Sequence, residues 1–287
     1  MDHPAAQQGA KTHPISAVTT PDGVRLHVKD WGRGRPVVMA HGWPLSADSF
    51  DDLSQALAEA GFRAISYDRR GFGRSDQPWD GYDYDTLADD LAAVVEATAS
   101  QEVTLLGFSM GGGEVARYMT RHAGRRVTQA ILVASVVPFM LQTPNHPQGV
   151  PAAVFDTMAQ AITADRALFW TGFFQEFFGH GGVGNPVSPE VMAWAAAVAM
   201  QAGLQPTLAC ARAFASTDFR ADLASFCVPT LVIHGTADKT VPIDAAGRAA
   251  ALGIAGAQLI EYAGAPHGLF ASDKVRLIAD VLNFVRG

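Results

Sequence analysis

The sequence has few charged residues and very few cysteines. Charged residues make up 17% of the 287 positions, and Cys210 and Cys227 are the two cysteines. A pair with this spacing supplies neither a disulfide framework nor a metal-binding cysteine motif. The low cysteine content therefore favours a reducing compartment.

Basic clusters and long apolar runs are also missing. The net charge is -7 and no block of Lys and Arg is present, so we expect neither nucleic acid nor an anionic membrane surface as a partner. No apolar run is long enough to span a bilayer. The first residues, MDHPAAQQGAKTHP, lack the basic start and apolar stretch of a secretory signal. These absences predict a cytoplasmic protein.

Motifs that hold metals or cofactors are absent as well. The chain contains no H-E-x-x-H, no C-x-x-C and no G-x-x-x-x-G-K-[ST]. No residue stands out as an axial haem ligand. The sequence therefore predicts neither a cofactor nor a metal ion.

What the chain does have is a regular alternation of strands and helices. Hydrophobic residues make up 48% of it, enough for a sizeable core. Strands are predicted at 36–40, 63–67, 103–106 and 127–134, after a hairpin within 15–28, with helices at 50–60, 84–99 and 110–122. This order is typical of right-handed crossovers and a mostly parallel sheet in an α/β fold.

The alternation stops between 138 and 221, where only helical segments are predicted. It resumes with strands at 229–233 and 258–262, a helix near 245–252 and a last helix that ends near Phe284. We therefore predict a core of 15–137 and 222–287, with 138–221 inserted as a helical cap. Residues 1–14 show no periodicity and are expected to be a disordered lead.

The pentapeptide Gly107–Gly111, GFSMG, joins a predicted strand to a predicted helix and fits the nucleophile pattern G-x-S-x-G. Glycine at both ends lets the strand and the helix close around a strained turn that exposes the Ser109 hydroxyl. Ser109 is therefore the candidate nucleophile. The alternative is a glycine-rich packing turn with an exposed serine.

A serine nucleophile needs a base, and His267 is the candidate. It lies in a loop after the strand 258–262, and such loops share the sheet edge that would present Ser109. His41 and His234 also follow strands, but each precedes a glycine and is expected to brace its loop. The alternative for His267 is a hydrogen bond within a tight loop.

Asp238, in the loop after the strand 229–233, is the candidate acid. The resulting chain order Ser, Asp, His matches the order for this type of site. Residues 135–138, the other plausible position, contain no carboxylate. Asp244 is the nearest competitor and is expected at an exposed helix start, while Asp68 and Asp76 lie in an arginine-rich loop and are expected to form ion pairs or brace it.

Two backbone N–H groups are predicted to stabilise the oxyanion that forms when a serine attacks a carbonyl. Met110 supplies one by its position after the nucleophile. Trp43, after the strand 36–40, supplies the second, because Gly42 allows close approach and Pro44 has no N–H.

The predicted cap is rich in aromatic residues. Phe173 and Phe177 are four residues apart and therefore share a helix face. This stripe forms either ordinary core or the wall of a dry acyl or aryl pocket. Further candidates for the pocket wall are Trp43, Met140, Phe214 and Val241.

Several of these segments together resemble a known family. HGWPLSADSF, YDRRGFGRSDQPW, GFSMGGGEVARY, STDF, VPTLVIHGTAD and APHG resemble the cofactor-free bacterial haloperoxidases, perhydrolases and aryl esterases of the α/β-hydrolase fold. The resemblance runs from about Thr19 to the end of the chain. It implies a triad of Ser109, Asp238 and His267, with the N–H groups of Trp43 and Met110 as oxyanion hole.

The resemblance also implies an activity. Members of this family hydrolyse small or aryl esters and convert short carboxylic acids and hydrogen peroxide to peracids, which oxidise halide after release. Pro44 matches the proline of peroxide-using members, whereas Thr240-Val241 departs from the bulkier aliphatic residue of many relatives. Homo-oligomers are frequent in the family.

Other functions on the same framework stay open at this stage. A hydroxynitrile lyase or a C–C bond hydrolase would use the same three residues, but such lyases usually need a polar or cationic cap residue near the serine. A signalling receptor of this fold would bind a small ligand and a protein partner. Haloalkane dehalogenases and epoxide hydrolases would need aspartate in place of Ser109.

Overall fold

The structure is a computed structural model, and it describes residues 14–98, 102–180 and 187–287. The predicted disordered lead, 1–14, therefore lies almost entirely outside the described residues. Within the described ranges, no helix combines the length and apolar character needed to cross a membrane.

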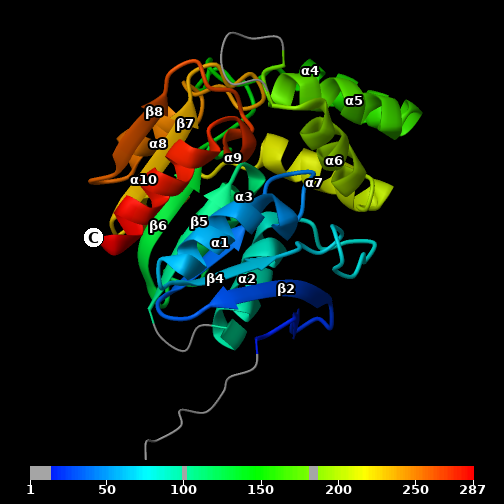
Figure 1. Cartoon of the computed structure of the whole chain (residues 1–287). Helices are drawn as coiled ribbons and strands as arrows, with labels where there is room; N and C mark the ends of the chain where they lie inside the picture. Colours follow the sequence, from blue (N-terminus) through cyan, green and yellow to red (C-terminus); the bar gives the residue numbers. More distant parts are fainter. Residues whose placement is uncertain (1–13, 99–101, 181–186) are drawn as a thin grey trace, which may run out of the picture.

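Among the described residues, eight strands form one sheet in the order β1-β2-β4-β3-β5-β6-β7-β8 (Figure 1). The strands are β1 (Ala17–Thr19), β2 (Arg25–Gly32), β3 (Pro36–Ala40), β4 (Arg63–Tyr67), β5 (Val103–Phe108), β6 (Val127–Val133), β7 (Thr230–Gly235) and β8 (Gln258–Tyr262). β1, β2 and β4 pair antiparallel, and every pair from β4 to β8 is parallel. The prediction of a mostly parallel sheet is thus confirmed.

Helices cover both faces of the sheet. They are η1 (Ala47–Phe50), α1 (Asp51–Glu59), α2 (Tyr84–Thr98), α3 (Met110–Arg121), η2 (Asp222–Ser225), α8 (Gly247–Gly253), α9 (Leu269–Ser272) and α10 (Lys274–Arg286). The crossover from β3 to β4 runs in the opposite direction along the sheet to the crossover from β5 to β6. Right-handed crossovers therefore place α1 and α3 on opposite faces, and α1 packs against α10 while α2 packs against α3.

Burial along the strands follows their place in the sheet. Every residue of β3 and of β5 is buried, as expected for central parallel strands covered on both faces. The antiparallel β2 instead has inward-facing Leu26, Val28 and Asp30 between more exposed residues. The carboxyl ends of the buried strands meet at one edge, where the candidate site lies.

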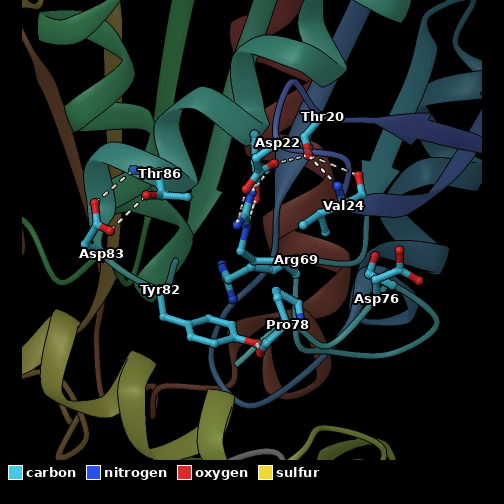
Figure 2. A network of polar contacts seen from close by, with 12 residues as sticks. Thr20, Asp22, Val24, Arg69, Asp76, Pro78, Tyr82, Asp83 and Thr86 are labelled. Atoms are coloured by element: carbon cyan, nitrogen blue, oxygen red, sulfur yellow. Dashed lines mark hydrogen bonds and ion pairs between the residues drawn. The ribbon is translucent and has the colours of Figure 1, made fainter. Parts of the chain in front are cut away.

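Side-chain hydrogen bonds fix the hairpin turn between β1 and β2 and the start of α2 (Figure 2). The Thr20 hydroxyl accepts from the Val24 N–H at 3.0 Å and also bonds Asp22. At the start of α2, the Asp83 carboxylate accepts from the Thr86 N–H at 3.0 Å and from its hydroxyl at 2.8 Å. These bonds satisfy backbone groups that a turn and a helix start would leave unpaired.

In the described residues between β6 and η2, four helices lie beyond the carboxyl ends of the strands, at the upper right of Figure 1. They are α4 (Ala152–Ala164), α5 (Arg166–Phe177), α6 (Pro189–Ala199) and α7 (Leu204–Ser216). α4 packs against α5 and α7, and α5 packs against α6. All four fall inside the predicted cap, whose bounds as a domain remain a prediction.

Candidate active site

Ser109 occupies a strained turn between β5 and α3. Its φ of 54° and ψ of −118° lie in a region that residues with a Cβ rarely adopt. A Cβ on Gly107 would lie 2.4 Å from the Gly111 carbonyl oxygen, and a Cβ on Gly111 would lie 2.1 Å from that of Ala40. The two glycines therefore allow the helix to start directly against the strands.

The structure brings Ser109, His267 and Asp238 together from the ends of β5, β8 and β7. His267 Nε2 lies 2.9 Å from Ser109 Oγ, and His267 Nδ1 lies 2.6 Å from Asp238 Oδ2. All three residues are buried. Because a carboxylate only accepts, Nδ1–H donates to Asp238 and leaves Nε2 free to accept from the Ser109 hydroxyl.

A second histidine contacts the same carboxylate. His234 Nε2 lies 3.2 Å from Asp238 Oδ2 and 2.8 Å from the Val241 carbonyl oxygen, and the Val241 N–H donates to Asp238 Oδ1 at 2.8 Å. Burial opposes the charged form of Asp238. Electrostatic attraction to the His267 ring and hydrogen bonds from both histidines outweigh it and lower the pKa of Asp238 to about 2.

His41 and His234 both brace loops, as their sequence contexts indicate. His41 Nε2 accepts from the Arg69 backbone N–H at 3.0 Å, and its Nδ1 donates to the Gly42 carbonyl oxygen at 2.9 Å. Complete burial and the neighbouring Arg69 charge lower the pKa of His41 to about 3, so it stays neutral. His41 therefore fixes the loop after β3 without carrying charge.

The competing aspartates lie outside this site. Asp244 is exposed and pairs with Arg248 at 2.8 Å. Asp68 accepts from the Arg74 backbone N–H and side chain, both at 2.8 Å, and Asp76 accepts from the Arg25 N–H at 2.9 Å. Both thus bond loop and arginine groups, the arrangement that the sequence indicates for them.

The two backbone N–H groups predicted for the oxyanion hole flank Ser109. Met110 is the first residue of α3, so its N–H has no partner within the helix. In the described part of the chain, neither this N–H nor that of Trp43 donates to another protein group. A Cβ on Gly42 would lie 3.0 Å from the Ser109 Cβ and 2.7 Å from the Phe108 ring, so glycine is what allows the Trp43 loop to approach.

A buried ion pair connects this loop to the helix behind Ser109, and the sequence analysis missed it. The Arg69 guanidinium contacts the Glu114 carboxylate on α3 and the His41 carbonyl oxygen, and the Tyr67 hydroxyl also donates to Glu114. The side chains of Arg69 and Glu114 are 1% and 0% exposed, so water could not solvate either charge if its partner were removed. The only sequence signal is a glutamate at an otherwise apolar position of a helix.

A cavity of about 330 Å³ opens on Ser109 between the sheet edge and the cap. Five of the six residues predicted to line a pocket are in its wall. They are Trp43, Met140, Phe173, Phe214 and Val241. The remaining wall, besides Ser109, comprises Val136, Val150, Val154, Phe155, Met158, Phe169, Gly172, Glu176, Lys239 and Thr240. The cavity is therefore mostly apolar.

Phe177 does not line this cavity, which corrects the prediction that it forms part of the pocket wall. It is fully buried one helical turn beyond Phe173, and its ring lies 4.8 Å from the His267 ring, centroid to centroid. Its carbonyl oxygen accepts from the Gly268 N–H at 2.8 Å. Phe177 instead holds the loop that carries His267 against the cap.

Two charged residues at the cavity, Glu176 and Lys239, were also missed. Both are exposed, so they lie at its mouth. Glu176 comes from cap helix α5, and Lys239 directly follows Asp238 in sequence. For Lys239, the sequence did offer one indication, which is its position next to the candidate acid Asp238. The rim of the cavity is therefore charged, while its interior is mostly apolar.

Comparison with known proteins agrees with this geometry. A family model described as alpha/beta hydrolase fold matches residues 35–273. A non-heme chloroperoxidase from Kitasatospora aureofaciens is 43% identical over 269 residues, covering 93% of this chain and 98% of that protein. A bifunctional esterase/perhydrolase from Acinetobacter calcoaceticus is 40% identical over 273 residues, covering 94% and 99%.

Solved structures show the same similarity. A bromoperoxidase from Bacillus anthracis has a TM-score of 0.90 at 38% identity and covers 96% of this chain and 100% of its own. An esterase from Exiguobacterium antarcticum has a TM-score of 0.90 at 32% identity, covering 95% and 99%. The chain therefore belongs to the α/β-hydrolase family, in the group that contains the non-heme haloperoxidases, perhydrolases and related esterases.

Proposed function

We propose that this protein is a serine hydrolase that cleaves small or aryl esters through an acyl-enzyme on Ser109, and that it also forms peracids from short carboxylic acids and hydrogen peroxide. The observation that carries the proposal is the continuous chain of hydrogen-bonding contacts from Ser109 Oγ through the His267 ring to Asp238.

In the acylation step, His267 Nε2 takes the Ser109 proton while Oγ attacks the ester carbonyl. The N–H groups of Trp43 and Met110 donate to the oxyanion that results. His267 then gives its proton to the leaving alcohol. Asp238 holds the ring in the tautomer that this transfer needs and stabilises the imidazolium.

Deacylation reverses these roles. His267 removes a proton from water or hydrogen peroxide, whose oxygen attacks the acyl carbon and frees the Ser109 oxygen. Water gives a carboxylic acid, and peroxide gives a peracid. A carboxylic acid can also acylate Ser109 with release of water, which opens the perhydrolase route. The similarity to a protein named esterase/perhydrolase and the proline at position 44 support this second route.

The cavity supports an apolar acyl or aryl substrate. Aromatic and aliphatic side chains line most of its wall, and the two charged groups lie at its mouth. A neutral ester reaches Ser109 across such a surface without leaving a charge unpaired.

Ser109→Ala tests the nucleophile. We expect kcat for p-nitrophenyl acetate to fall by about 10⁴ or more, because the remaining groups can orient the ester but cannot form an acyl-enzyme. Ser216→Ala is the matched control, since it removes an exposed hydroxyl that bonds only the Arg212 carbonyl oxygen in the described structure. Retained turnover in Ser109→Ala would exclude Ser109 as the nucleophile.

Bromination of monochlorodimedone with acetate, hydrogen peroxide and bromide tests the perhydrolase route. We expect it to depend on acetate and to be lost in Ser109→Ala. Many turnovers per enzyme molecule would also count against the signalling-receptor alternative, which predicts a single labelling event and capture of a partner.

A further inference from the structure

We propose that Met140 and Met158 are modification sites that the enzyme oxidises with its own peracid. Their thioethers would become sulfoxides during perhydrolysis, before the peracid leaves the cavity. This inference rests on the proposed perhydrolase function and adds to it a site of self-modification and a limit on turnover.

Both residues belong to the wall of the cavity that contains Ser109. Met140 is 1% exposed and lies in the segment between β6 and α4, while Met158 is half-buried on α4. A peracid released from Ser109 therefore meets these side chains before it reaches solvent.

The other described methionines are placed differently. Met192 is half-buried on α6 and does not line the cavity. Met39, Met110 and Met119 are at most 2% exposed, and none of them lines the cavity. Met200 is 41% exposed at the end of α6 and also does not line the cavity. An oxidant that acts from solvent should thus reach Met200 first, and one that forms in the cavity should reach Met140 and Met158 first.

The chemistry needs nothing beyond the peracid. The sulfur lone pair attacks the terminal peroxy oxygen, the O–O bond breaks, and the peroxy proton passes to the departing carboxylate. The products are one sulfoxide and one carboxylic acid, which is a substrate for the next acylation of Ser109. The acid is therefore regenerated, and each oxidation consumes one hydrogen peroxide.

Oxidation changes the cavity that the proposed ester substrates use. A sulfoxide is polar where the thioether is apolar, and the wall around Met140 is mostly aliphatic and aromatic. A buried sulfoxide oxygen there lacks water. We therefore expect activity toward apolar esters to decline as perhydrolysis proceeds.

Peptide mass spectrometry after timed turnover tests the inference. Wild-type enzyme receives acetate and hydrogen peroxide, with hydrogen peroxide alone and Ser109→Ala as parallel arms. We expect the ratio of sulfoxide at Met140 and Met158 to sulfoxide at Met200 to rise several-fold in the first arm only. An excess of free methionine in solution should suppress oxidation of Met200 and spare that of the cavity pair.

A variant series supplies a second readout. In Met140→Leu/Met158→Leu, the half-life of p-nitrophenyl ester activity during perhydrolysis should lengthen several-fold, each variant being compared with its own starting rate. Met200→Leu is the matched control and should leave the half-life as in wild type.

Two failures are distinguishable. If bromination shows that peracid forms, but free methionine in solution abolishes all methionine oxidation or Met200 is oxidised first, the self-modification inference is overturned and the proposed function stands. If no peracid forms in wild type, the perhydrolase proposal fails and the inference fails with it.

Discussion

At the scale of single residues, the charge of Asp238 depends on two histidines from different segments. His234 precedes it on β7 and His267 follows β8. Together they lower the pKa of Asp238 to about 2 against the opposing effect of burial. A carboxyl group in the unfolded chain has a pKa near 4. The charged form of Asp238 therefore stabilises the fold by about 2 kcal/mol at neutral pH.

This contribution gives the first prediction. Because the folded-state pKa of Asp238 is the lower one, its stabilisation is complete above about pH 4 and disappears as the pH falls toward 2. In Asp238→Asn, unfolding free energies from urea titrations should lose this part of their pH dependence. Its kcat for p-nitrophenyl acetate should fall by about 10⁴, because the amide no longer selects the productive His267 tautomer.

Asp244→Asn is the control for both readouts, because this exposed carboxylate pairs, among the described residues, only with Arg248 on the surface. We expect it to change neither kcat nor the acid unfolding curve appreciably. An Asp238→Asn enzyme with near wild-type kcat would show that Asp238 does not orient His267.

The candidate site residues could be predicted from the sequence because each of them follows a strand. Ser109 directly follows β5, and Asp238 and His267 lie in the loops after β7 and β8, so a shared sheet edge follows from the fold alone. The contacts of Phe177 and His234 were not accessible in this way. They depend on how α5 meets the loop after β8 and on the curvature of the loop after β7, which neither spacing nor composition specifies.

At the scale of elements, the packing of α3 against the sheet edge gives the second prediction. A Cβ on Gly112 would lie 1.9 Å from the Ser135 Oγ and 2.6 Å from its Cβ. Gly112→Ala should therefore lower the free energy of unfolding by about 2 kcal/mol, although alanine favours helix. Adding Ser135→Gly removes both contacting atoms and should restore much of the loss, as urea denaturation would show.

Gly172→Ala on α5 is the matched control. A Cβ there has no atom within 4 Å. The higher helix propensity of alanine should therefore raise the free energy of unfolding of this variant by up to about 1 kcal/mol. If Gly112→Ala were equally stabilising, the close approach of α3 to the segment after β6 would be wrong.

The third prediction concerns the buried pair between Arg69 and Glu114, which joins the loop after β4 to α3. Burial raises the pKa of Glu114 although Arg69 opposes this effect. Glu114→Gln would leave the Arg69 guanidinium buried without a counter-charge, and we expect a loss of about 4 kcal/mol in unfolding free energy. Glu114→Gln should change the free energy of unfolding strongly and the KM for esters only little, since neither Arg69 nor Glu114 lines the cavity.

Asp85→Asn provides the comparison, because Asp85 pairs with Arg117 and Arg121 but is 49% exposed. Solvent screens such a pair, so its loss should cost at most about 1 kcal/mol. Equal losses in the two variants would mean that burial adds nothing to the Glu114 pair.

Strands β3 to β8 were predictable to within one or two residues, because most of them are continuous apolar runs, whereas β2 extends to Gly32, beyond the hairpin predicted within 15–28. The predicted strands 63–67 and 258–262 coincide with β4 and β8. Helix starts were less accessible. A helix was expected from Ala245, but α8 starts at Gly247, since the preceding turn makes hydrogen bonds back to Pro242 and Ile243 that no periodicity indicates.

At the scale of the whole molecule, the cavity is shared between the sheet and the inserted helices. Its wall takes Trp43 and Val241 from loops of the core, and Phe155 and Phe214 from α4 and α7. Substrate size is therefore set by how the two parts meet.

Phe155→Ala gives the fourth prediction. Removing this ring enlarges the acyl space, so kcat/KM for p-nitrophenyl octanoate relative to acetate should rise by about tenfold. Leu168→Ala is the control, because Leu168 is 70% exposed on α5 and does not line the cavity. An unchanged chain-length profile in Phe155→Ala would place the acyl group elsewhere.

Trp43 bonds the cap and serves the proposed oxyanion site at once. Its indole N–H donates to the Thr207 carbonyl oxygen on α7 at 3.0 Å, while its backbone N–H is the proposed second donor to the oxyanion. Outward movement of the cap helices would break that indole hydrogen bond. It would also displace the Trp43 peptide group, whose N–H is proposed to stabilise the oxyanion. We therefore expect esters to enter past Glu176 and Lys239 while the cap stays in place. Chemical crosslinks between the cap and the core should then leave turnover unchanged.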